Sequence, residues 1–460
     1  MLTVSIQGSF EEAKHSILEG QKKGEMIELR IDLMEKQDLT HISKLRHLCK
    51  LPVIFTVRRK DQGGAFEGNE REREEKFQEL LPLKPDFIDL EYDCAFADAL
   101  DPSIPRIVSY HDFEKTPEDL EKILPQLNHF PAKIKKIATF ANSSLDALRM
   151  LNFVQKHHVA GMCMGEKGGI TRLLGPVVDS PLVYTFLGEA TAPGQLSLEE
   201  LTGLYRYLTL NRKTKVYALI GDPVDKSIGH LFHNEAFLKL NVDALYVKFP
   251  ITPPEVPQFF KEIATLPFYG FSVTMPLKEH MAPHLDEVSD EGKEIGAINT
   301  LVKRGGKWFG TNTDGIGALD AIEKEGKVAG KLILIIGAGG AAKAIAYEAS
   351  KRGGKVIIAN RTMKKGEILA KQVKGMAVSI DEIPEYDILI NTTSVGMAPE
   401  IDKLPIAEKD IQEKKVFFDV VINPKETKFL NLARNKGGKV IIGREMFEGQ
   451  ALQQLREWLS

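Results

Sequence analysis

The sequence predicts an α/β protein in which an N-terminal (β/α)₈ barrel is followed by a two-lobed α/β unit that ends in a doubly wound Rossmann lobe. Three observations lead to this prediction: the length, the strand–helix alternation of the first 210 residues, and a glycine-rich turn after the apolar run Leu332–Ile336. A chain of 460 residues exceeds one ordinary domain, so two or three domains are expected.

The barrel is predicted from short apolar runs that alternate with stretches of helical spacing, such as Arg71–Leu80 and Ser143–Lys156. Eight strands within about 200 residues match the lower size limit of a (β/α)₈ barrel. The expected strands are Leu2–Ile6, Met26–Ile31, Val53–Val57, Phe87–Leu90, Arg106–Ser109, Ile134–Ala138, Gly161–Met164 and Leu182–Thr185.

A polar, basic stretch at Asn211–Lys215 precedes a new strand, Val216–Ile220, and is the best candidate for a linker. We therefore expect a barrel over residues 1–212. For the second half, the family resemblance described below implies an α/β lobe over 213–318 that is completed by about 440–460, and a Rossmann lobe over 319–439.

Composition narrows the class of protein. Hydrophobic residues make up 43% and charged residues 27%, as in soluble globular proteins, and this excludes disorder as the main state. The formal charge is only -3, so nucleic-acid binding is not expected. The start of the chain lacks a signal-peptide layout and no stretch approaches about 18 apolar residues. A cytoplasmic enzyme without membrane contact is expected.

Metal and disulfide chemistry are not expected. Cys49, Cys94 and Cys163 are scattered without CxxC spacing. The eleven histidines show no ligand-type pairing with carboxylates, and the adjacent His157 and His158 would diverge on a helix. The prediction for metal ligands is therefore none.

The glycine-rich turn predicts a dinucleotide site. Gly337-Ala338-Gly339-Gly340-Ala341-Ala342 has GxGxxA spacing between a buried strand and a helix that runs to about Lys351. Gly337 would form the tight turn, Gly339 would allow close approach of a pyrophosphate, and Ala342 would permit close helix packing.

The following strand, Lys355–Ala359, selects the cofactor. It ends in Asn360-Arg361-Thr362 with Lys365 beyond, where an NAD enzyme would carry Asp or Glu. Two cations there suit a 2′-phosphate, so NADP(H) is preferred, although both could simply begin a solvated helix. The expected cofactor-binding residues are Gly337, Ala338, Gly339, Gly340, Ala341, Asn360, Arg361, Thr362 and Lys365.

Seven strings in the second half resemble the shikimate dehydrogenase family, in order, across about 245 residues. They are GDPVDKSIGHLFHN (221–234), FSVTMPLKE (271–279), GAINTL (296–301), GTNTDGIG (310–317), GAGGAAKA (337–344), ANRT (359–362) and NTTSVGM (391–397). The resemblance implies catalytic roles for Lys278 and Asp314. Reduction of a ketone builds charge on oxygen, which requires such a proton donor. The implied substrate-binding residues are Ser227, Thr274, Asn299 and Gln450.

Two positions depart from that family. Its carboxylate-binding SxSP reads Ser227-Ile228-Gly229-His230 here, so one hydroxyl is missing and His230 could replace it. A tyrosine expected near 422 is Ile422. A lost hydrogen bond to a charged group is worth about 1.5–3 kcal/mol, so weaker substrate binding is expected.

The first half resembles type I 3-dehydroquinate dehydratase over about 205 residues, a (β/α)₈ family that uses a Schiff-base lysine. The motifs are ELRID (28–32), PVIFTVR (52–58), SYHDF (109–113), KIA (136–138), GGITRLLG (168–175) and TAPGQLS (191–197). The resemblance implies Lys136 as the imine-forming lysine and His111 as the general acid/base. Strand alternation turns Lys135 the other way. The implied substrate-binding residues are Ser5, Glu28, Arg30, Arg58, Arg172, Thr191 and Gln195.

Here too the chain departs from the pattern. Gln62-Gly63-Gly64 stands where the family has Glu-Gly-Gly, and Thr191 replaces a serine. A neutral amide stabilises imidazolium less than a carboxylate does. We therefore expect a lower pKa for His111, or compensation by Asp61 or Glu67.

The two resemblances imply consecutive reactions on small molecules: 3-dehydroquinate to 3-dehydroshikimate, then NADPH-dependent reduction to shikimate. Two alternatives stay open. One is a catabolic quinate or shikimate oxidiser that uses NAD. The other is a metabolite-sensing module on a decayed scaffold, which should have lost one of Lys136, His111, Lys278 and Asp314, and none is lost.

Overall fold

A computed structural model describes residues 1–188 and 195–460 of the chain. By their internal contacts these residues divide into two compact units. The first unit comprises Met1–Val216, Phe237–Ile251 and Pro257–Pro267. The second comprises Tyr217–Ala236, Thr252–Val256 and Phe268–Ser460.

Eight parallel strands form a nearly closed barrel in the order β7-β6-β5-β4-β3-β2-β1-β8. All eight strands predicted from the sequence are present, with ends shifted by at most three residues. They are β1 (Leu2–Gly8), β2 (Met26–Met34), β3 (Val53–Thr56), β4 (Phe87–Glu91), β5 (Arg106–Asp112), β6 (Ile134–Phe140), β7 (Ala160–Met164) and β8 (Val183–Phe186).

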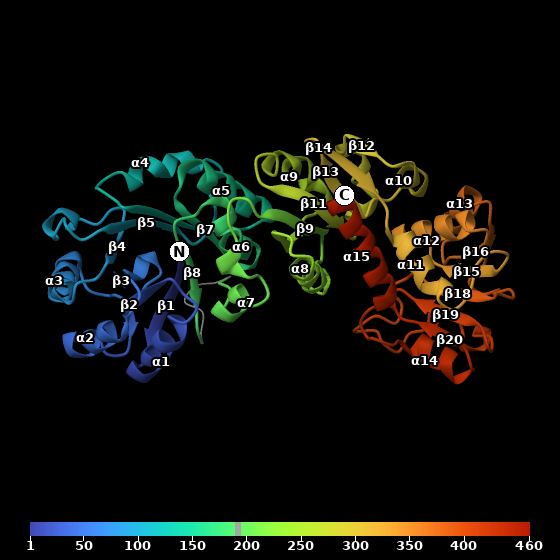
Figure 1. Cartoon of the computed structure of the whole chain (residues 1–460), viewed down its shortest axis with the longest axis horizontal. Coiled ribbons are helices and arrows are strands. Elements are labelled where there is room, and N and C mark those ends of the chain that lie inside the picture. Colours follow the sequence, from blue (N-terminus) through green and yellow to red (C-terminus); the bar gives the residue numbers. More distant parts are fainter. Residues whose placement is uncertain (189–194) are drawn as a thin grey trace. The chain divides into compact units, whose positions relative to one another are not determined.

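Helices follow the barrel strands and cover their outer side (Figure 1). Four of them begin with a capping box, in which a Ser or Asn side chain and an acid three residues later satisfy the free amides of the first turn. The helices are α1 (Phe10–Gly20), α2 (Leu39–Leu48), α3 (Glu70–Leu80), α4 (Leu124–Leu127), α5 (Ser144–His157), α6 (Gly169–Leu173) and α7 (Leu198–Thr202).

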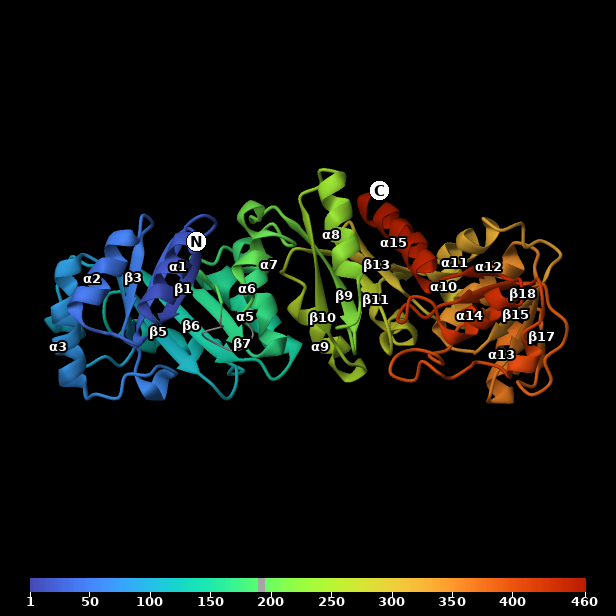
Figure 2. The same ribbon diagram turned by 90° about the horizontal axis from the view of Figure 1, so that it is seen from below.

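A six-stranded mixed sheet has the order β10-β9-β11-β13-β14-β12, and β13 runs antiparallel to both of its neighbours. Figure 2 shows β9, β10, β11 and β13 side by side. The elements are β9 (Lys215–Gly221), α8 (Gly229–Lys239), β10 (Ala244–Pro250), α9 (Val256–Glu262), β11 (Phe268–Val273), β12 (Glu287–Val288), α10 (Asp290–Ile295), β13 (Thr300–Arg304) and β14 (Lys307–Thr311).

The C-terminal helix α15 (Gly443–Leu459) packs on this sheet, although it lies more than 130 residues further along the chain. Trp458 donates its indole N–H to the carbonyl of Leu301 at 3.0 Å. A Cβ at Gly270 would lie 2.4 Å from that indole nitrogen, so only glycine allows this approach.

The Rossmann lobe has six parallel strands in the order β17-β16-β15-β18-β19-β20, as predicted for a doubly wound sheet. The order reverses between β15 and β18, which is where such sheets bind ligands. The elements are α11 (Asp314–Glu323), β15 (Leu332–Ile336), α12 (Gly340–Lys351), β16 (Lys355–Ala359), α13 (Met363–Gln372), β17 (Met376–Val378), β18 (Ile388–Asn391), β19 (Val416–Asp419), α14 (Lys428–Asn435) and β20 (Lys439–Ile441).

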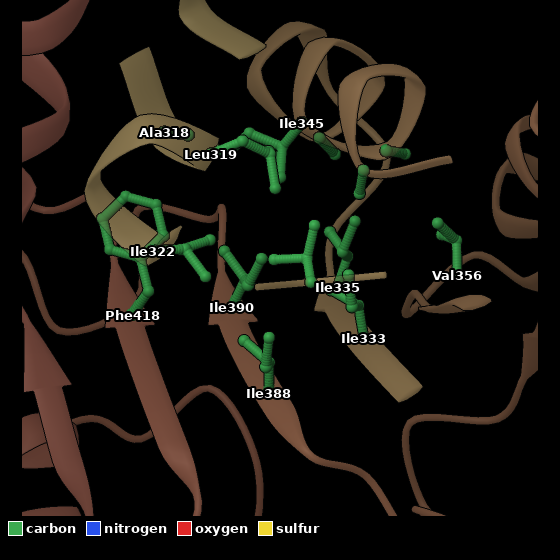
Figure 3. Close-up of a cluster of buried hydrophobic side chains, with 14 of the residues drawn as sticks. Ala318, Leu319, Ile322, Ile333, Ile335, Ile345, Val356, Ile388, Ile390 and Phe418 are labelled. Carbon is green, nitrogen blue, oxygen red and sulfur yellow. The ribbon is translucent and has the colours of Figure 1, made fainter. Parts of the chain in front are cut away.

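The apolar run of β15 is buried on both faces, which explains its continuous hydrophobicity. Ile333 and Ile335 pack against Leu319, Ile322 and Ile345 of α11 and α12 (Figure 3). The alternate residues of the strand face a second cluster on the other side of the sheet. This double burial fixes the strand and holds the glycine turn that follows it.

Candidate functional site

The barrel interior changes from apolar to charged along its strands. Met26, Ile134 and Leu182 pack near the amino ends of β2, β6 and β8. Two residues further along, every second strand of the barrel contributes one side chain to the interior. The register of the sheet places these side chains at one level of the barrel axis; they are Glu28 of β2, Asp89 of β4, Lys136 of β6 and Tyr184 of β8. Barrels normally fill such a layer with branched apolar side chains. A charged layer at this depth therefore indicates a site, and we name these four residues the charged layer.

Lys136 lies at the centre of the charged layer. Its Nζ donates to Asp89 Oδ2 at 2.8 Å and lies 4.3 Å from the ring centre of Tyr184. Asp89 also pairs with Arg58 Nη2 at 2.8 Å. Burial alone would raise the pKa of Asp89, but the charges of Arg58 and Lys136 outweigh it and lower that pKa well below its usual range. Asp89 is therefore a carboxylate that holds both cations.

Buried hydrogen bonds fix the surrounding polar groups. Arg58 also pairs with Glu91 at 3.2 Å and donates to Ser109 Oγ at 2.7 Å. Arg30 forms a two-bond pair with Asp32, at 3.1 and 2.8 Å. The predicted residues Ser5 and Glu28 are also joined: Glu28 accepts from Ser5 Oγ at 2.6 Å and from Thr56 Oγ1 at 2.9 Å.

His111 lies near the carboxyl end of β5, on the same face of the strand as Ser109. Its ring stacks on Phe113 with the centroids 6.0 Å apart. Burial, followed by the charges of Arg58 and Lys136, lowers the pKa of His111 well below 6.5. Its Nδ1 and the Oε1 of Gln62 are both buried without a hydrogen-bond partner among the residues that the structure describes. The imidazole is therefore neutral at physiological pH.

The expected direction of the His111 pKa is confirmed, but its main causes are burial and two cations. The expected compensation by Asp61 or Glu67 is wrong. Asp61 pairs with Arg59 at 3.2 Å and Glu67 with Lys60 at 2.5 Å, and both acids are about two-thirds exposed. The negative charge that raises the pKa of His111 belongs to Asp89.

Arg172 of α6 is buried and donates to the carbonyl of Cys163 at 2.7 Å. Burial lowers the pKa of its guanidinium to about 10, and a nearby anionic group would oppose that loss. Gln195 begins the described segment 195–460. Thr191, predicted to bind substrate, lies outside the described residues.

Sequence reasoning missed Asp89, Glu91 and Tyr184. The signal for the acids was the strand Phe87–Glu91, FIDLE, because two carboxylates on the inward face of a barrel strand need buried cations. Arg73 supplies a second cation by pairing with Glu91. Nothing in the sequence singles out Tyr184 from ordinary core aromatic residues.

In the second unit, Lys278 and Asp314, for which the resemblance implies catalytic roles, form a largely buried ion pair. Lys278 lies in a short 3₁₀ turn after β11, and Asp314 begins α11. The other carboxylate oxygen of Asp314 accepts from Asn299 Nδ2 at 2.7 Å. The structure thus brings two catalytic candidates and one predicted hydroxyl-binding residue into one network.

Gln450 joins this network from α15. Asn299 Nδ2 lies 3.4 Å from Gln450 Oε1. A Cβ at Gly317 of α11 would lie 2.4 Å from the backbone nitrogen of Gln450, so glycine is needed where the two helices meet. That close packing brings Gln450 to Asn299 from a distant part of the sequence.

Gln454, one turn further along α15, was not predicted. It is 1% exposed, its Oε1 accepts from Ser272 Oγ at 2.8 Å, and its Nε2 donates to the Asn299 carbonyl and to Thr300 Oγ1, each at 3.1 Å. Gln454 therefore ties β11, which leads to Lys278, to β13, which follows Asn299.

The remaining substrate-binding candidates follow the adjacent strands β9 and β11. Thr274 donates its amide to the carbonyl of Ile220 at 2.9 Å, and Ser227 Oγ accepts the amide of Gly229 at 3.1 Å. His230 lies in the first turn of α8. Ile422 is 39% exposed after β19, where it offers no hydroxyl.

The glycine turn fits a dinucleotide. Gly337 has φ 114°, and a Cβ there would lie 2.6 Å from Thr392 Oγ1, whereas a Cβ at Gly339 would meet nothing within 4 Å. Gly339 leaves open space at the start of α12, where no side chain of the described residues caps the helix. A phosphate could therefore approach the free amides, and the helix dipole would favour its charge.

The predicted cations lie after β16. Arg361 and Lys365 are exposed, and Asn360 Nδ2 donates to the carbonyl of Thr362 at 2.8 Å. Ala338 and Ala341 flank the glycines of the turn. Exposed cations beside the second strand leave room for a 2′-phosphate.

A cavity of about 650 Å³ borders Lys278 but is lined by Ala282, Leu285 and Phe309 and by none of the predicted hydroxyl-binding residues. We therefore define the site by the hydrogen-bond network. Across residues 1–188 and 195–460, no group of three or more His, Cys, Asp or Glu side chains could hold a metal ion. None of the described helices is long and apolar enough to cross a membrane.

Three family models match the chain. They describe type I 3-dehydroquinase over residues 3–212, a shikimate dehydrogenase substrate binding domain over 219–301, and a shikimate/quinate 5-dehydrogenase over 320–429.

Relatives match over nearly the whole chain. A chloroplastic bifunctional 3-dehydroquinate dehydratase/shikimate dehydrogenase of Arabidopsis thaliana is 35% identical over 94% of this chain and 77% of its own. A shikimate biosynthesis protein AroDE of Chlamydia pneumoniae is 36% identical over 100% of this chain and 95% of its own.

A solved structure matches the second half of the chain. The crystal structure of the Thermus thermophilus shikimate dehydrogenase with NADP(H) and shikimate is 33% identical over 53% of this chain and 93% of its own, with a TM-score of 0.51.

Proposed function

The chain belongs to the family of bifunctional 3-dehydroquinate dehydratases/shikimate dehydrogenases, and from this premise we propose which of its residues carry each reaction. It dehydrates 3-dehydroquinate to 3-dehydroshikimate and reduces 3-dehydroshikimate to shikimate with NADPH, two steps of the shikimate pathway. A decayed metabolite sensor should have lost one of the four candidate catalytic residues, and all four are present.

In the barrel, Lys136 condenses with the substrate ketone and water leaves; the proton of its ammonium stays on the nitrogen, which gives a protonated imine that accepts electrons in the next step. His111, neutral because of its lowered pKa, removes a proton from the carbon beside the imine. The electron pair shifts to the imine nitrogen. The hydroxyl on the following carbon then leaves as water with the proton returned by His111, and hydrolysis frees Lys136.

We assign substrate recognition in the barrel to Arg172, which binds the carboxylate, and to Ser5, Glu28, Arg30, Arg58, Thr191 and Gln195 around the ring. Charge supports the assignment. Arg172 is only 2% exposed and burial lowers the pKa of its guanidinium, so a bound carboxylate would compensate its charge.

In the second unit, bound NADPH supplies hydride. Lys278 donates a proton to the ketone oxygen as charge builds there, and Asp314 holds the lysine and a substrate hydroxyl. Ser227, Thr274, Asn299 and Gln450 orient the other polar groups of the ring. Gly337 to Ala341 receive the pyrophosphate, and Asn360, Arg361, Thr362 and Lys365 the 2′-phosphate.

We propose domain boundaries at 1–212, 213–318 with about 440–460, and 319–439. The three sheets and the three matched ranges support them. We also propose that the enzyme works in the cytoplasm, because its three cysteines are buried free thiols, as expected in a reducing compartment.

One observation carries the residue assignment: in each half, a largely buried lysine pairs with a buried aspartate. The test supplies 3-dehydroquinate and NADPH together and follows loss of NADPH absorbance. Both sites are active if NADPH is consumed only with 3-dehydroquinate present. Consumption only with added 3-dehydroshikimate would locate a defect in the barrel.

The dehydratase should tolerate mild acid. His111 must be neutral to accept a proton, so kcat/KM falls only as the pH drops through its pKa, which lies well below 6.5. Gln62→Glu adds a carboxylate nearby, raises that pKa, and moves the acid limb of the pH profile upward. Gln78→Glu, outside the site, should leave the profile unchanged. An acid limb already at 6.5 in the unmodified enzyme would contradict this expectation.

Gln454→Leu should slow reduction about 10- to 100-fold in kcat, because it leaves buried partners of the Asn299–Asp314 network unsatisfied, at about 1–3 kcal/mol. The KM for NADPH and the dehydratase activity of the same chain should not change. Gln453→Leu on the same helix is the control. Deuterium-labelled NADPH distinguishes two causes of a lower rate. Slower hydride transfer changes the kinetic isotope effect, whereas partial unfolding leaves the isotope effect of the remaining active enzyme unchanged.

Arg361→Ala should raise the KM for NADPH at least tenfold and leave the KM for NADH nearly constant. A charge-assisted hydrogen bond to phosphate contributes about 1.5–3 kcal/mol. Steady-state kinetics with both cofactors measures the difference, with Lys371→Ala at the far end of α13 as control. Equal effects on both cofactors would show that Arg361 does not bind the 2′-phosphate and would reopen the catabolic, NAD-dependent alternative.

A further inference from the structure

Tyr184 on β8 has no part in the reaction as derived from Lys136 and His111, yet it lies against the reacting atom. Its ring centre is 4.3 Å from Lys136 Nζ, and its side chain belongs to the charged layer. It is only 3% exposed. The aromatic face therefore covers a nitrogen that carries positive charge both as an ammonium and as a protonated imine.

The hydroxyl of Tyr184 is unusual because it is buried without a hydrogen-bond partner in the described parts of the chain. Burial, followed by the charges of Glu28 and Asp89, raises the pKa of this phenol well above 10, so it remains a neutral donor. A buried polar group without a partner destabilises a folded protein, and such groups call for an explanation.

The neighbouring carboxylates do not explain why the Tyr184 hydroxyl is present. Glu28 accepts from Ser5 and Thr56, and Asp89 is held by Lys136 and Arg58. A phenylalanine would fill the same apolar volume against Met26 and Leu182 without a stranded hydroxyl. The hydroxyl thus costs stability in the free enzyme, and a bound molecule rich in oxygen would satisfy it.

We propose that Tyr184 is a catalytic residue of the dehydratase site. Its hydroxyl hydrogen-bonds an oxygen of the bound substrate, on or next to the carbon that Lys136 attacks, and its ring covers the imine nitrogen. This inference rests on the proposed role of Lys136. It adds a substrate contact and a cation-stabilising face that no residue of the family resemblance supplies.

Tyr184→Phe tests the proposal because it removes only the oxygen. Stability and activity should change in opposite directions: the melting temperature of the ligand-free protein rises, while kcat/KM for 3-dehydroquinate falls about 2- to 12-fold, the equivalent of about 0.5–1.5 kcal/mol for one hydrogen bond. Shikimate dehydrogenase activity, measured on the same chain, should stay at its original value.

Tyr386→Phe is the matched control. The hydroxyl of Tyr386 donates to the carbonyl of Asp410 at 2.9 Å and accepts from the amide of Gln412 at 3.0 Å. Its removal should lower the melting temperature and leave dehydration unchanged. An unchanged kcat/KM for dehydration in Tyr184→Phe would overturn the proposal, whatever its melting temperature.

A trapping experiment separates this proposal from the assignment of Lys136. Borohydride delivers hydride to the imine carbon and converts the substrate–lysine adduct into a stable amine that mass spectrometry locates. Both assignments are supported if the adduct forms on Lys136 in the unmodified chain and in Tyr184→Phe, while the variant turns over more slowly. Absence of the adduct in the unmodified chain overturns the role of Lys136 and, with it, the proposal for Tyr184.

Discussion

Lys136→Met should abolish dehydration, with kcat reduced on the order of 10⁴-fold or more, because no other group can form the imine that accepts electrons. The change also takes one of two cations from Asp89, which keeps only Arg58. Because a buried carboxylate that loses a partner is destabilised, we expect a lower melting temperature as well. Direct measurement of 3-dehydroshikimate formation gives the activity.

Lys135→Met is the matched control, since the neighbouring lysine of β6 is less buried and alternation turns it away from the barrel interior. Both variants should reduce added 3-dehydroshikimate at the normal rate, which shows that the second unit is folded. Substantial dehydration by Lys136→Met, or an equal loss in Lys135→Met, would refute the assignment of Lys136.

Lys278→Met should lower kcat for reduction about 10²- to 10⁴-fold, the usual contribution of a positioned general acid. The variant also leaves Asp314 without its cation, although Asn299 still donates to that carboxylate at 2.7 Å. Binding of NADPH should change little, because the glycine turn and Arg361 are untouched. Stopped-flow absorbance measures the hydride step, and fluorescence measures cofactor binding.

Lys293→Met, at an exposed lysine of α10 paired with Asp290, controls for loss of a positive charge in the same lobe. Dehydration by the Lys278→Met chain should be normal, so that 3-dehydroshikimate accumulates when 3-dehydroquinate and NADPH are supplied together. If the variant still forms shikimate at the normal rate, another group must protonate the ketone.

The catalytic candidates could be predicted because each lies in a continuous motif. Lys136 belongs to KIA, His111 to SYHDF, Lys278 to FSVTMPLKE and Asp314 to GTNTDGIG. The partners of Asp89 and Gln454 could not be predicted, because they lie far away in the chain. Asp89 pairs with Lys136, 47 residues further on, and Gln454 pairs with Asn299 and Thr300, about 155 residues earlier. Only barrel closure and the packing of α15 create those contacts.

His111 illustrates the limit of local reasoning. From Gln62 the sequence predicted a lowered pKa, and the direction is right. The strongest causes, burial and the charges of Arg58 and Lys136, depend on strands that meet across the barrel. The acids that seemed close in sequence, Asp61 and Glu67, instead pair with Arg59 and Lys60 at the surface.

The sequence by itself determined the strand and helix periods, the glycine turn, the order of the two enzymatic halves and the residues inside each motif, because all of these are local patterns. Tertiary structure alone decided which charges neutralise one another. It paired Lys136 with Asp89, brought Gln450 and Gln454 to Asn299 through α15, and left the hydroxyl of Tyr184 without a partner among the described residues. Burial makes those pairings strong, and burial exists only after the distant strands have packed.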